Sequence, residues 1–286
     1  MTIAEELQKA GHSTKEACKV AGISRSGYYA SKRSKEAVLI EADDVELIER
    51  IKAIKLEHPF WGYRRIRAWL RYRDGIVINE KRVYRIMKEN SLLVDRKLHK
   101  AKRTPQRSKP RADMPLQFWG IDMTKFMTAS GWLYLVIVLD WYTKKIVGWD
   151  VSLRSKSGDW KSALEMAVTN EFPDGVKDNG LKLISDNGSQ PTSTTFMRDM
   201  ETLGIEQIFT SYNNPKGNAD TERMMRTIKE EVIWLYEFNS IEEARQTIGR
   251  WIDNDHNKLY LYRKLGYRSP EEFEKSYAES QLSKVA

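Results

Sequence analysis

Residues 118–140 read FWGIDMTKFMTASGWLYLVIVLD, and this stretch decides the fold of the second half of the chain. Its apolar runs predict two strands, residues 118–127 and 132–140. The second run is almost wholly apolar, which is typical of a strand buried at the centre of a sheet. A third strand is expected over residues 145–151, after a turn around Tyr142, so that the three strands form a meander.

Downstream of the meander, helical and strand patterns alternate. Three antiparallel strands followed by alternating helices and strands predict a ribonuclease-H-like α/β fold, a mixed five-stranded sheet with flanking helices. In that order the first and fourth strands are neighbours. The expected elements are a helix over about 157–170, a strand over 181–185, a helix over about 193–203, a strand over 206–209, a loop over 211–218 and a long helix to about residue 237.

Three carboxylates at the ends of these elements carry the functional prediction. Asp122 lies in the first strand, Asp186 directly follows the fourth, and Glu222 lies near the start of the long helix. Like charges this close repel each other, so the cluster is expected to hold cations. Oxygen ligands suit Mg²⁺ or Mn²⁺, and two such ions clamp the attacking and leaving oxygens of a phosphodiester. We therefore predict a metal-dependent active site for polynucleotidyl transfer.

Each acid also has an ordinary explanation when it is taken alone. Asp186-Asn187-Gly188 has the composition of a turn, and an acid such as Glu222 is favoured at a helix start by the macrodipole. Asp122 could be a strand residue with no role. The three together, in this order and on these elements, favour the active site.

Basic and polar side chains surround the acids in the sequence. Lys229 follows Glu222 by two helical turns and so shares its face, where it can contact a phosphate. The loop over residues 211–218 contains Pro215 and Gly217 and is expected to act as a gate. Tyr212 is expected either to stack on an unpaired base or to pack internally. The DNA-binding residues expected here are Lys229, Arg223, Arg226, Tyr212, Lys216 and Asn218.

Charge divides the chain unevenly, although its net value is +8. Residues 1–112 hold 27 Lys and Arg against 14 Asp and Glu, whereas the remaining residues hold 21 against 26. A basic front half suggests DNA binding. Residues 96–112 carry eight basic side chains, two prolines and no acid, a composition typical of a linker that follows a DNA backbone. Its expected DNA contacts are Lys102, Arg103 and Arg107.

The front half contains two helix pairs that resemble helix-turn-helix units. In the first, Ser13 or Thr14 caps one helix, with Ala17, Val20 and Ala21 on its inner face, and Ser24 caps a second that carries Arg25 and Tyr28 toward DNA. A separate amphipathic helix is expected over residues 41–57. The second pair comprises residues 62–73 and a helix that Asn79 caps and that runs to about Asn90. Outward arginines for DNA contact are expected at Arg64, Arg65 and Arg67, and also at Arg71 and Arg73.

Several classes of protein are excluded by composition. The single Cys18 and four scattered histidines rule out a disulfide framework and a spaced Cys/His metal motif. No apolar stretch of about 18 residues predicts a membrane span, and the N-terminus lacks a signal peptide's apolar core. A reducing cytoplasmic setting is expected, with the bacterial nucleoid as the place of DNA binding.

The segments WGIDMT, LISDNGSQ and NNPKGNADTERMMRTIKEE resemble the three motifs of DDE transposases and retroviral integrases. The chain is most similar to the second-reading-frame transposases of bacterial insertion sequences in the family named after insertion sequence three. HPFWGYRRIRAWLR resembles that family's helix-turn-helix, and residues 240–273 resemble its C-terminal signature. Two departures occur there: His256 stands where the family usually has Tyr, and Tyr262 stands where it usually has His.

The resemblance implies that Asp122, Asp186 and Glu222 are the metal ligands and that Lys229 is the basic residue seven positions after the Glu. It also implies 3′-end cleavage at terminal inverted repeats, strand transfer into target DNA, and a multimer that holds two DNA ends. An upstream-frame partner or fusion is a further expectation.

We therefore predict a DNA transposase of an insertion sequence. The rivals are a nuclease on the same core that only hydrolyses nucleic acid, and a non-catalytic DNA-binding regulator of transposition. The expected domains are an N-terminal helix-turn-helix (1–38), a second helical DNA-binding region (39–95), the basic linker (96–112), the catalytic core (113–240) and a helical tail (241–286).

Overall fold

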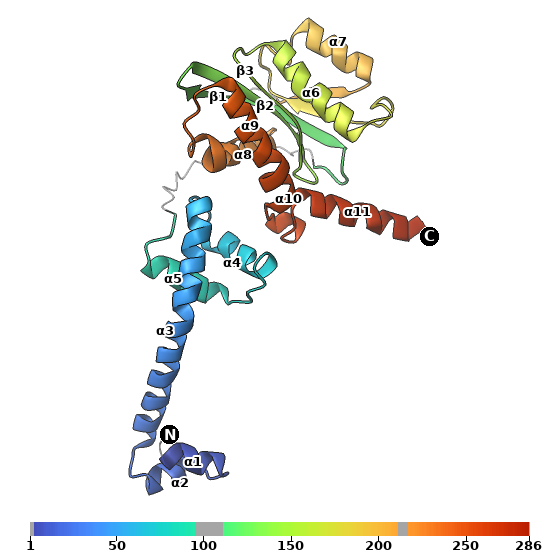
Figure 1. The fold of residues 1–286 in the computed structure, drawn as a ribbon. Helices are drawn as coiled ribbons and strands as arrows, with labels where there is room; N and C mark the ends of the chain where they lie inside the picture. Colours follow the sequence, from blue (N-terminus) through green and yellow to red (C-terminus); the bar gives the residue numbers. More distant parts are fainter. Residues whose placement is uncertain (1–2, 95–110, 211–216, 286) are drawn as a thin grey trace. The chain divides into compact units, whose positions relative to one another are not determined.

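The computed structural model describes residues 3–94, 111–210 and 217–285, and the chain separates into two compact units. One unit contains the helices of the front half up to residue 94, without residues 71–75. The other contains the sheet and the helices that cover it, through the C-terminal helix (Figure 1).

The sheet has the predicted five strands, in the order β3-β2-β1-β4-β5. β1, β2 and β3 pair antiparallel as a meander, while β4 runs parallel to β1 and β5 parallel to β4. This confirms the ribonuclease-H-like arrangement and the predicted adjacency of the first and fourth strands. The strands are β1 Phe118–Thr128, β2 Gly131–Asp140, β3 Ile146–Ser152, β4 Lys182–Ser185 and β5 Glu206–Phe209.

Helices cover both faces of the sheet because β2 is apolar on both sides (Figure 1). Its alternate residues Val136 and Val138 pack with Trp160 and Phe196 on one face. The β2 side chains that point to the other face, among them Ile137, pack in a cluster with side chains of the two helices on that face. The first face is covered by α6 (Ser157–Glu171) and α7 (Thr194–Leu203), and the second by α8 (Ala219–Ile228) and α9 (Ile241–Arg250).

The long helix predicted to reach about residue 237 ends earlier. α8 stops at Ile228, a π-helical turn covers Lys229–Ile233, and Trp234 caps it. The chain then turns back so that Phe238 is buried edge-on against Phe126, with ring centroids 5.7 Å apart. If the helix that begins at Ala219 continued to residue 237, the chain would not turn back toward Phe126 and Phe238 would not be buried there.

The C-terminal segment is helical, as predicted, and its first part belongs to the core of the sheet. Ala244, Ile248 and Ile252 are fully buried in the cluster that faces α8. A second π-helical stretch, Trp251–His256, leads into α10 (Asn257–Leu259), a 3₁₀ turn (Arg263–Leu265) and α11 (Pro270–Val285). Lys145 lies 2.8 Å from both Glu171 and Glu274, and so joins α11 to α6 through one partly buried ammonium group.

The front of the chain differs from the prediction in three ways. The sequence predicted neither α1 (Ile3–Lys9) nor the continuity of α3 (Arg25–Glu57), which is one helix where two were expected. The predicted caps hold: Ser13 forms a capping box with Glu16 before α2 (Thr14–Val20), and Ser24 accepts from the Gly27 amide. The inner face of α2 is shifted, because Cys18 is buried and Val20 is exposed.

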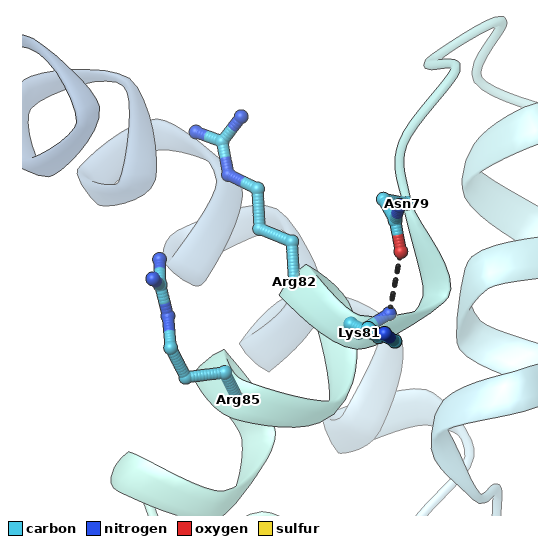
Figure 2. Close-up of a pocket in the computed structure, with 4 residues that line it drawn as sticks. All are labelled: Asn79, Lys81, Arg82 and Arg85. Atoms are coloured by element: carbon cyan, nitrogen blue, oxygen red, sulfur yellow. Dashed lines mark hydrogen bonds between the residues drawn. The ribbon is translucent and has the colours of Figure 1, made fainter. Parts of the chain in front are cut away.

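The second helix pair is confirmed as α4 (Tyr63–Tyr72) and α5 (Glu80–Glu89). The Asn79 side chain accepts from the Lys81 amide at 2.9 Å, as an N-cap should (Figure 2). Both helices bury one apolar face, which includes Ile66 and Leu70 on α4 and Val83, Ile86 and Met87 on α5. Within the described ranges, no helix has both the length and the apolar character needed to cross a bilayer.

Candidate active site

Two strands and one helix bring the three predicted acids to one place. Gly120 pairs with Ile184 where β1 runs parallel to β4. Asp122 and Asp186 each lie two residues beyond this pair, at corresponding positions on the two neighbouring segments. Each carboxylate accepts from a nearby amide: Asp122 Oδ1 from Met123 N at 2.8 Å and Asp186 Oδ1 from Gly188 N at 3.0 Å. Asp186 is exposed, whereas Asp122 is partly buried.

Gly120 sets the position of the third acid because α8 lies directly on its Cα. A Cβ placed on Gly120 would overlap Thr221 Oγ1 and the Trp141 indole nitrogen, and would lie 2.9 Å from Asn218 Oδ1. Trp141 Nε1 donates to the fully buried Thr221 Oγ1 at 3.0 Å. This close contact holds the N-terminal turn of α8 on β1 and places Glu222 in the electrostatic field of Asp122.

The charges of these groups act on one another. The pKa of Asp122 is raised to about 7, first by burial and then by the negative charges of Asp186 and Glu222. The Met123 amide and the positive charge of Lys229 act in the opposite direction. The structure therefore unites the three acids and Lys229 in one electrostatic cluster, although their roles remain predictions.

The cluster fits a divalent cation by its chemistry. Its donors are carboxylate oxygens, which suit Mg²⁺ or Mn²⁺. Burial is the main cause of the raised pKa of Asp122, and a cation would offset both that cost and the added repulsion from Asp186 and Glu222. In the ranges that the structure describes, no three Asp, Glu, His or Cys side chains are close enough together to enclose a metal ion. Asp186 and Glu222 are exposed, so their side chains have room to turn toward one.

The other predicted contacts of this unit have different placements. Arg223 and Arg226 are exposed on α8, and Arg226 pairs with Glu230 at 2.8 Å. Asn218 is buried, and its amide nitrogen donates to the Ile121 carbonyl at 3.2 Å, so it holds α8 on β1 and does not face DNA. Tyr212, Lys216, Lys102, Arg103 and Arg107 lie outside the described residues.

The DNA contacts predicted in the front half are partly wrong. Arg25 is exposed in the first turn of α3, but Tyr28 is buried among Ala4, Ala17 and Cys18. The Tyr28 hydroxyl donates to Gln8 Oε1 at 2.7 Å, because the unpredicted α1 packs over it. Tyr28 is therefore a core residue of this helix cluster.

The arginines predicted to point outward on α4 are mostly engaged within the helix pair. Arg67 Nε donates to the Ile78 carbonyl at 3.0 Å and is partly buried, so its predicted outward direction is wrong. Arg64 pairs with Glu80 at 3.2 Å, and the Arg65 guanidinium lies 5.4 Å from the centre of the Trp61 ring. Helical spacing alone did not reveal these partners.

The C-terminal signature forms a hydrogen-bonded network on the outer strand. Asn257 Nδ2 donates to the Ile146 carbonyl at 3.0 Å, and the Ile146 amide donates back to Asn257 Oδ1 at 3.1 Å. Fully buried His256 contacts Asn257 Oδ1 through Nδ1 and the Tyr262 hydroxyl through Nε2, each at 2.9 Å. The two departures from the family pattern, His256 and Tyr262, are thus hydrogen-bonded to each other. The family usually has Tyr at the first position and His at the second, so this chain has the same two residue types in exchanged positions.

Acid is expected to weaken this network. Burial lowers the pKa of His256 from its ordinary value of 6.5 to about 4. Between these two values the unfolded chain binds a proton that the folded chain does not, so stability is lost as pH falls from 6.5 toward 4. We expect the free energy of unfolding to fall by about 2 kcal/mol when the pH is lowered from 7 to 5, because of the protonation of His256 in the unfolded chain.

Urea unfolding at the two pH values measures this change, with His256→Gln as the comparison. The variant should lose that part of the pH dependence. An equal pH dependence in both proteins would contradict the assignment.

An exchange of the pair tests the hydrogen bond itself. Tyr262→Phe leaves a buried His256 nitrogen without its partner and should cost about 1–3 kcal/mol of unfolding free energy. The double variant His256→Tyr/Tyr262→His should recover to within about 1 kcal/mol of wild type, because the two groups act together. Thermal unfolding of His256→Tyr, Tyr262→His and the double variant gives the coupling energy, and simple additivity would show that the pair is not coupled.

Comparisons with known proteins agree with this architecture. Residues 42–100 match an HTH-like domain, and residues 112–215 and 203–270 match an integrase core domain. The transposase for insertion sequence element IS904 of Lactococcus lactis subsp. lactis (strain IL1403) is 32% identical over 241 residues, which is 80% of this chain and 93% of that protein. The uncharacterized 31 kDa protein of insertion element IS600 from Shigella sonnei is 30% identical over 276 residues, 91% of this chain and 98% of that protein.

Among solved structures, the catalytic core domain of BIV integrase matches 60% of this chain and 99% of its own length. Its sequence identity is 17% and its TM-score 0.42.

Proposed function

The chain belongs to the insertion-sequence transposases with an integrase core domain, and from this premise we propose that Asp122, Asp186 and Glu222 carry its cutting and joining of DNA. Membership makes it a polynucleotidyl transferase. The proposal adds the residues, the cofactor and the order of reaction: 3′-end cleavage at the element's terminal inverted repeats, then strand transfer into target DNA by the freed hydroxyl.

One observation supports the choice of residues above the others. Asp122 is an acid whose pKa is raised to about 7, and both Asp186 and Glu222 contribute to that shift by their negative charge. Acids that repel one another in a partly buried place are costly to a folded protein unless a cation joins them. We propose that two Mg²⁺ or Mn²⁺ ions are held there. When bound, such ions polarise the scissile phosphodiester and activate the attacking water or hydroxyl.

The chain's own groups orient the acids and the substrate. The Met123 and Gly188 amides hold the Asp122 and Asp186 carboxylates in place by hydrogen bonds of 2.8 and 3.0 Å. Lys229 brings a positive charge into the field of the same cluster, where it favours a phosphate group. Arg223 and Arg226 present further cations on the exposed side of α8.

The proposed substrate is double-stranded DNA, both as the element's ends and as the target. Two ends must be held together for joining, so we propose that the protein works as a homo-oligomer on DNA. An upstream-frame partner or fusion is part of the proposal, because end recognition in this family is expected to involve one.

The test uses purified protein, Mg²⁺ or Mn²⁺, and a labelled duplex that carries the DNA end flanking the gene. Both 3′-end nicks and joined products are scored, with Glu222→Gln as the control. Metal-dependent joining that Glu222→Gln abolishes is the expected result. Nicking without joining would favour the hydrolytic rival, and binding without cleavage would favour the regulator.

A further inference from the structure

The turn that carries Asp186 is attached to a distant part of the same unit by the side chain of Gln190. Gln190 Nε2 donates to the Ser155 hydroxyl oxygen at 2.7 Å and to the Ser155 carbonyl at 3.3 Å. Ser155 lies 35 residues earlier, in the segment between β3 and α6. Because a carbonyl oxygen only accepts, the amide nitrogen of Gln190 faces Ser155 and its oxygen faces the other way.

Ser155 extends this connection to β1, beside Asp122. The Ser155 hydroxyl donates to Met123 Sδ at 3.1 Å, and its oxygen has lone pairs with which it accepts from Gln190 at the same time. The Met123 amide in turn donates to Asp122 Oδ1 at 2.8 Å. The Asp186 turn is thus linked, through Gln190 and Ser155, to the residue whose amide orients Asp122.

The carboxamide oxygen of Gln190 lies on the same side of the turn as the Asp186 carboxylate. A Cβ placed on Gly188 would lie 2.9 Å from Asp186 Oδ1 and 3.4 Å from Gln190 Oε1, so both oxygens lie close to this glycine. Gln190 Oε1 also accepts from the Ser189 hydroxyl at 3.2 Å. A movement of the Gln190 side chain therefore changes the surroundings of the Asp186 carboxylate.

The opposite side of the turn has attachments of its own. Asn187 Nδ2 donates to the Thr210 carbonyl at 2.6 Å, and Gln207 Nε2 donates to the Pro191 carbonyl at 2.9 Å. Both bonds tie the turn to β5 and the residue after it, on the side of β4 away from β1. Loss of the bond from Gln190 would thus loosen the turn on the side of β1.

We propose that Gln190 is a positioning residue for Asp186: it holds the turn against Ser155, keeps the Asp186 carboxylate at a fixed place relative to Asp122, and so raises the affinity of the site for a divalent cation. The inference rests on the proposed function, since it assumes that these two acids bind the metal. The Asp186 side chain is exposed, so the turn beneath it determines where its oxygens lie. Groups that orient the ligands of a metal without touching it commonly contribute about 10–100-fold to its affinity.

The experiment measures Mn²⁺ binding by the full-length chain directly, from the electron paramagnetic resonance signal of the free ion. The test variants are Gln190→Met, which keeps the length of the side chain but removes its hydrogen bonds, Ser155→Ala, and the double variant. The matched control is Gln117→Met, another partly buried glutamine of the same unit, which loses the bond that it accepts from the Asp113 amide at 2.8 Å. Asp186→Asn shows the binding that remains when a proposed ligand is lost, and thermal unfolding without metal establishes that each variant is folded.

We expect Gln190→Met to raise the Mn²⁺ dissociation constant about 10–100-fold, while its unfolding midpoint falls by only about 2–4 °C, the cost of one hydrogen bond in a protein of this size. Ser155→Ala should act in the same direction. The double variant should remain within about twofold of Gln190→Met, because both substitutions remove the same bond. Gln117→Met should lose similar stability and bind Mn²⁺ as wild type does.

DNA joining separates an effect on the metal from an effect on DNA. Joining by Gln190→Met should be weak at low Mn²⁺ and should return to within about threefold of wild type at saturating Mn²⁺. Joining that saturating Mn²⁺ does not restore would overturn the proposal, because Gln190 would then act on DNA and not through Asp186.

Three binding results would also overturn it. The first is wild-type Mn²⁺ affinity in Gln190→Met. The second is an equal loss of affinity in Gln117→Met, because that result means a general loosening of the fold. The third is additive losses in the double variant, which would exclude the bond between Gln190 and Ser155 as the cause.

The proposed function is scored separately in the same samples by cleavage and joining of the element's end. Wild type that joins DNA, together with a Gln190→Met variant that binds Mn²⁺ normally, overturns this inference and leaves the function intact. Wild type that binds Mn²⁺ but neither cleaves nor joins, with Gln190→Met weakened in Mn²⁺ binding, overturns the function and supports the positioning role. Absence of Mn²⁺ binding by wild type, with or without the duplex, overturns both.

Discussion

Asp122→Asn is expected to lower metal-dependent cleavage and joining of a DNA end by at least about 1000-fold, the loss typical when an enzyme loses a group that stabilises its transition state. The amide keeps the shape of the side chain and its acceptor for the Met123 amide, but removes the charge that a cation would bind. Single-turnover product formation measures the loss. Asp174→Asn, which removes an exposed acid from a loop, is the matched control and should remain within about twofold of wild type.

The same substitution should have the opposite effect on stability. The folded pKa of Asp122 is about 7, above its ordinary value of 3.8, so the folded chain retains a proton that the unfolded chain has released. Stability due to this group is therefore present at low pH and lost as pH rises from about 4 to 7.

Without divalent ions at pH 8, Asp122→Asn should raise the free energy of unfolding by about 1–3 kcal/mol. An inactive variant that is also less stable than wild type would mean that Asp122 is structural, and full activity would exclude it from the site.

Gly120→Ala is expected to abolish most activity while leaving all three acids in the chain. The added methyl group overlaps Thr221 Oγ1 and Trp141 Nε1, so α8 must move away from β1 and carry Glu222 with it. Overpacking of this kind costs about 1–3 kcal/mol, and a displacement of about 1 Å can cost 100-fold in rate. We expect a loss of at least about 100-fold in joining, measured beside the wild type under saturating metal and DNA.

Gly158→Ala is the matched control, because a Cβ there meets no atom within 4 Å. Its activity should equal that of wild type. Retention of activity by Gly120→Ala within about threefold would show that the contact between β1 and α8 does not set the geometry of the acids.

The sequence predicted the sheet well because its signals are local. The apolar run over residues 132–140 identified β2, an interior strand that lies between β3 and β1, and Asp186 does follow the end of the fourth strand. Asp122 was expected at a strand end, but it lies inside β1, which continues to Thr128. Asn79, Ser13 and Ser24 were identified as caps because capping involves residues only a few positions apart.

The failures share a different cause, which is packing between distant parts of the chain. Tyr28 is buried by a helix that the sequence did not reveal, and Arg67 is held by a carbonyl eleven residues away. Asn218 belongs to a contact with β1, 97 residues earlier. Gly120 carried one usable signal: a glycine inside a strand often marks the close approach of another backbone or side chain. Its partners Thr221 and Trp141 could be recognised only in three dimensions.

The Asn257 side chain has a further consequence for the way copies of this protein can meet. β3 is the last strand of the sheet on its side, and an open edge strand is a template for pairing with a strand of another chain. Asn257 occupies both the amide and the carbonyl of Ile146, and Arg245 Nε donates to the carbonyl of Val151 at 2.8 Å. Side chains thus already form hydrogen bonds with backbone groups of Ile146 and Val151, near the two ends of β3. Such an edge resists aggregation through strand addition.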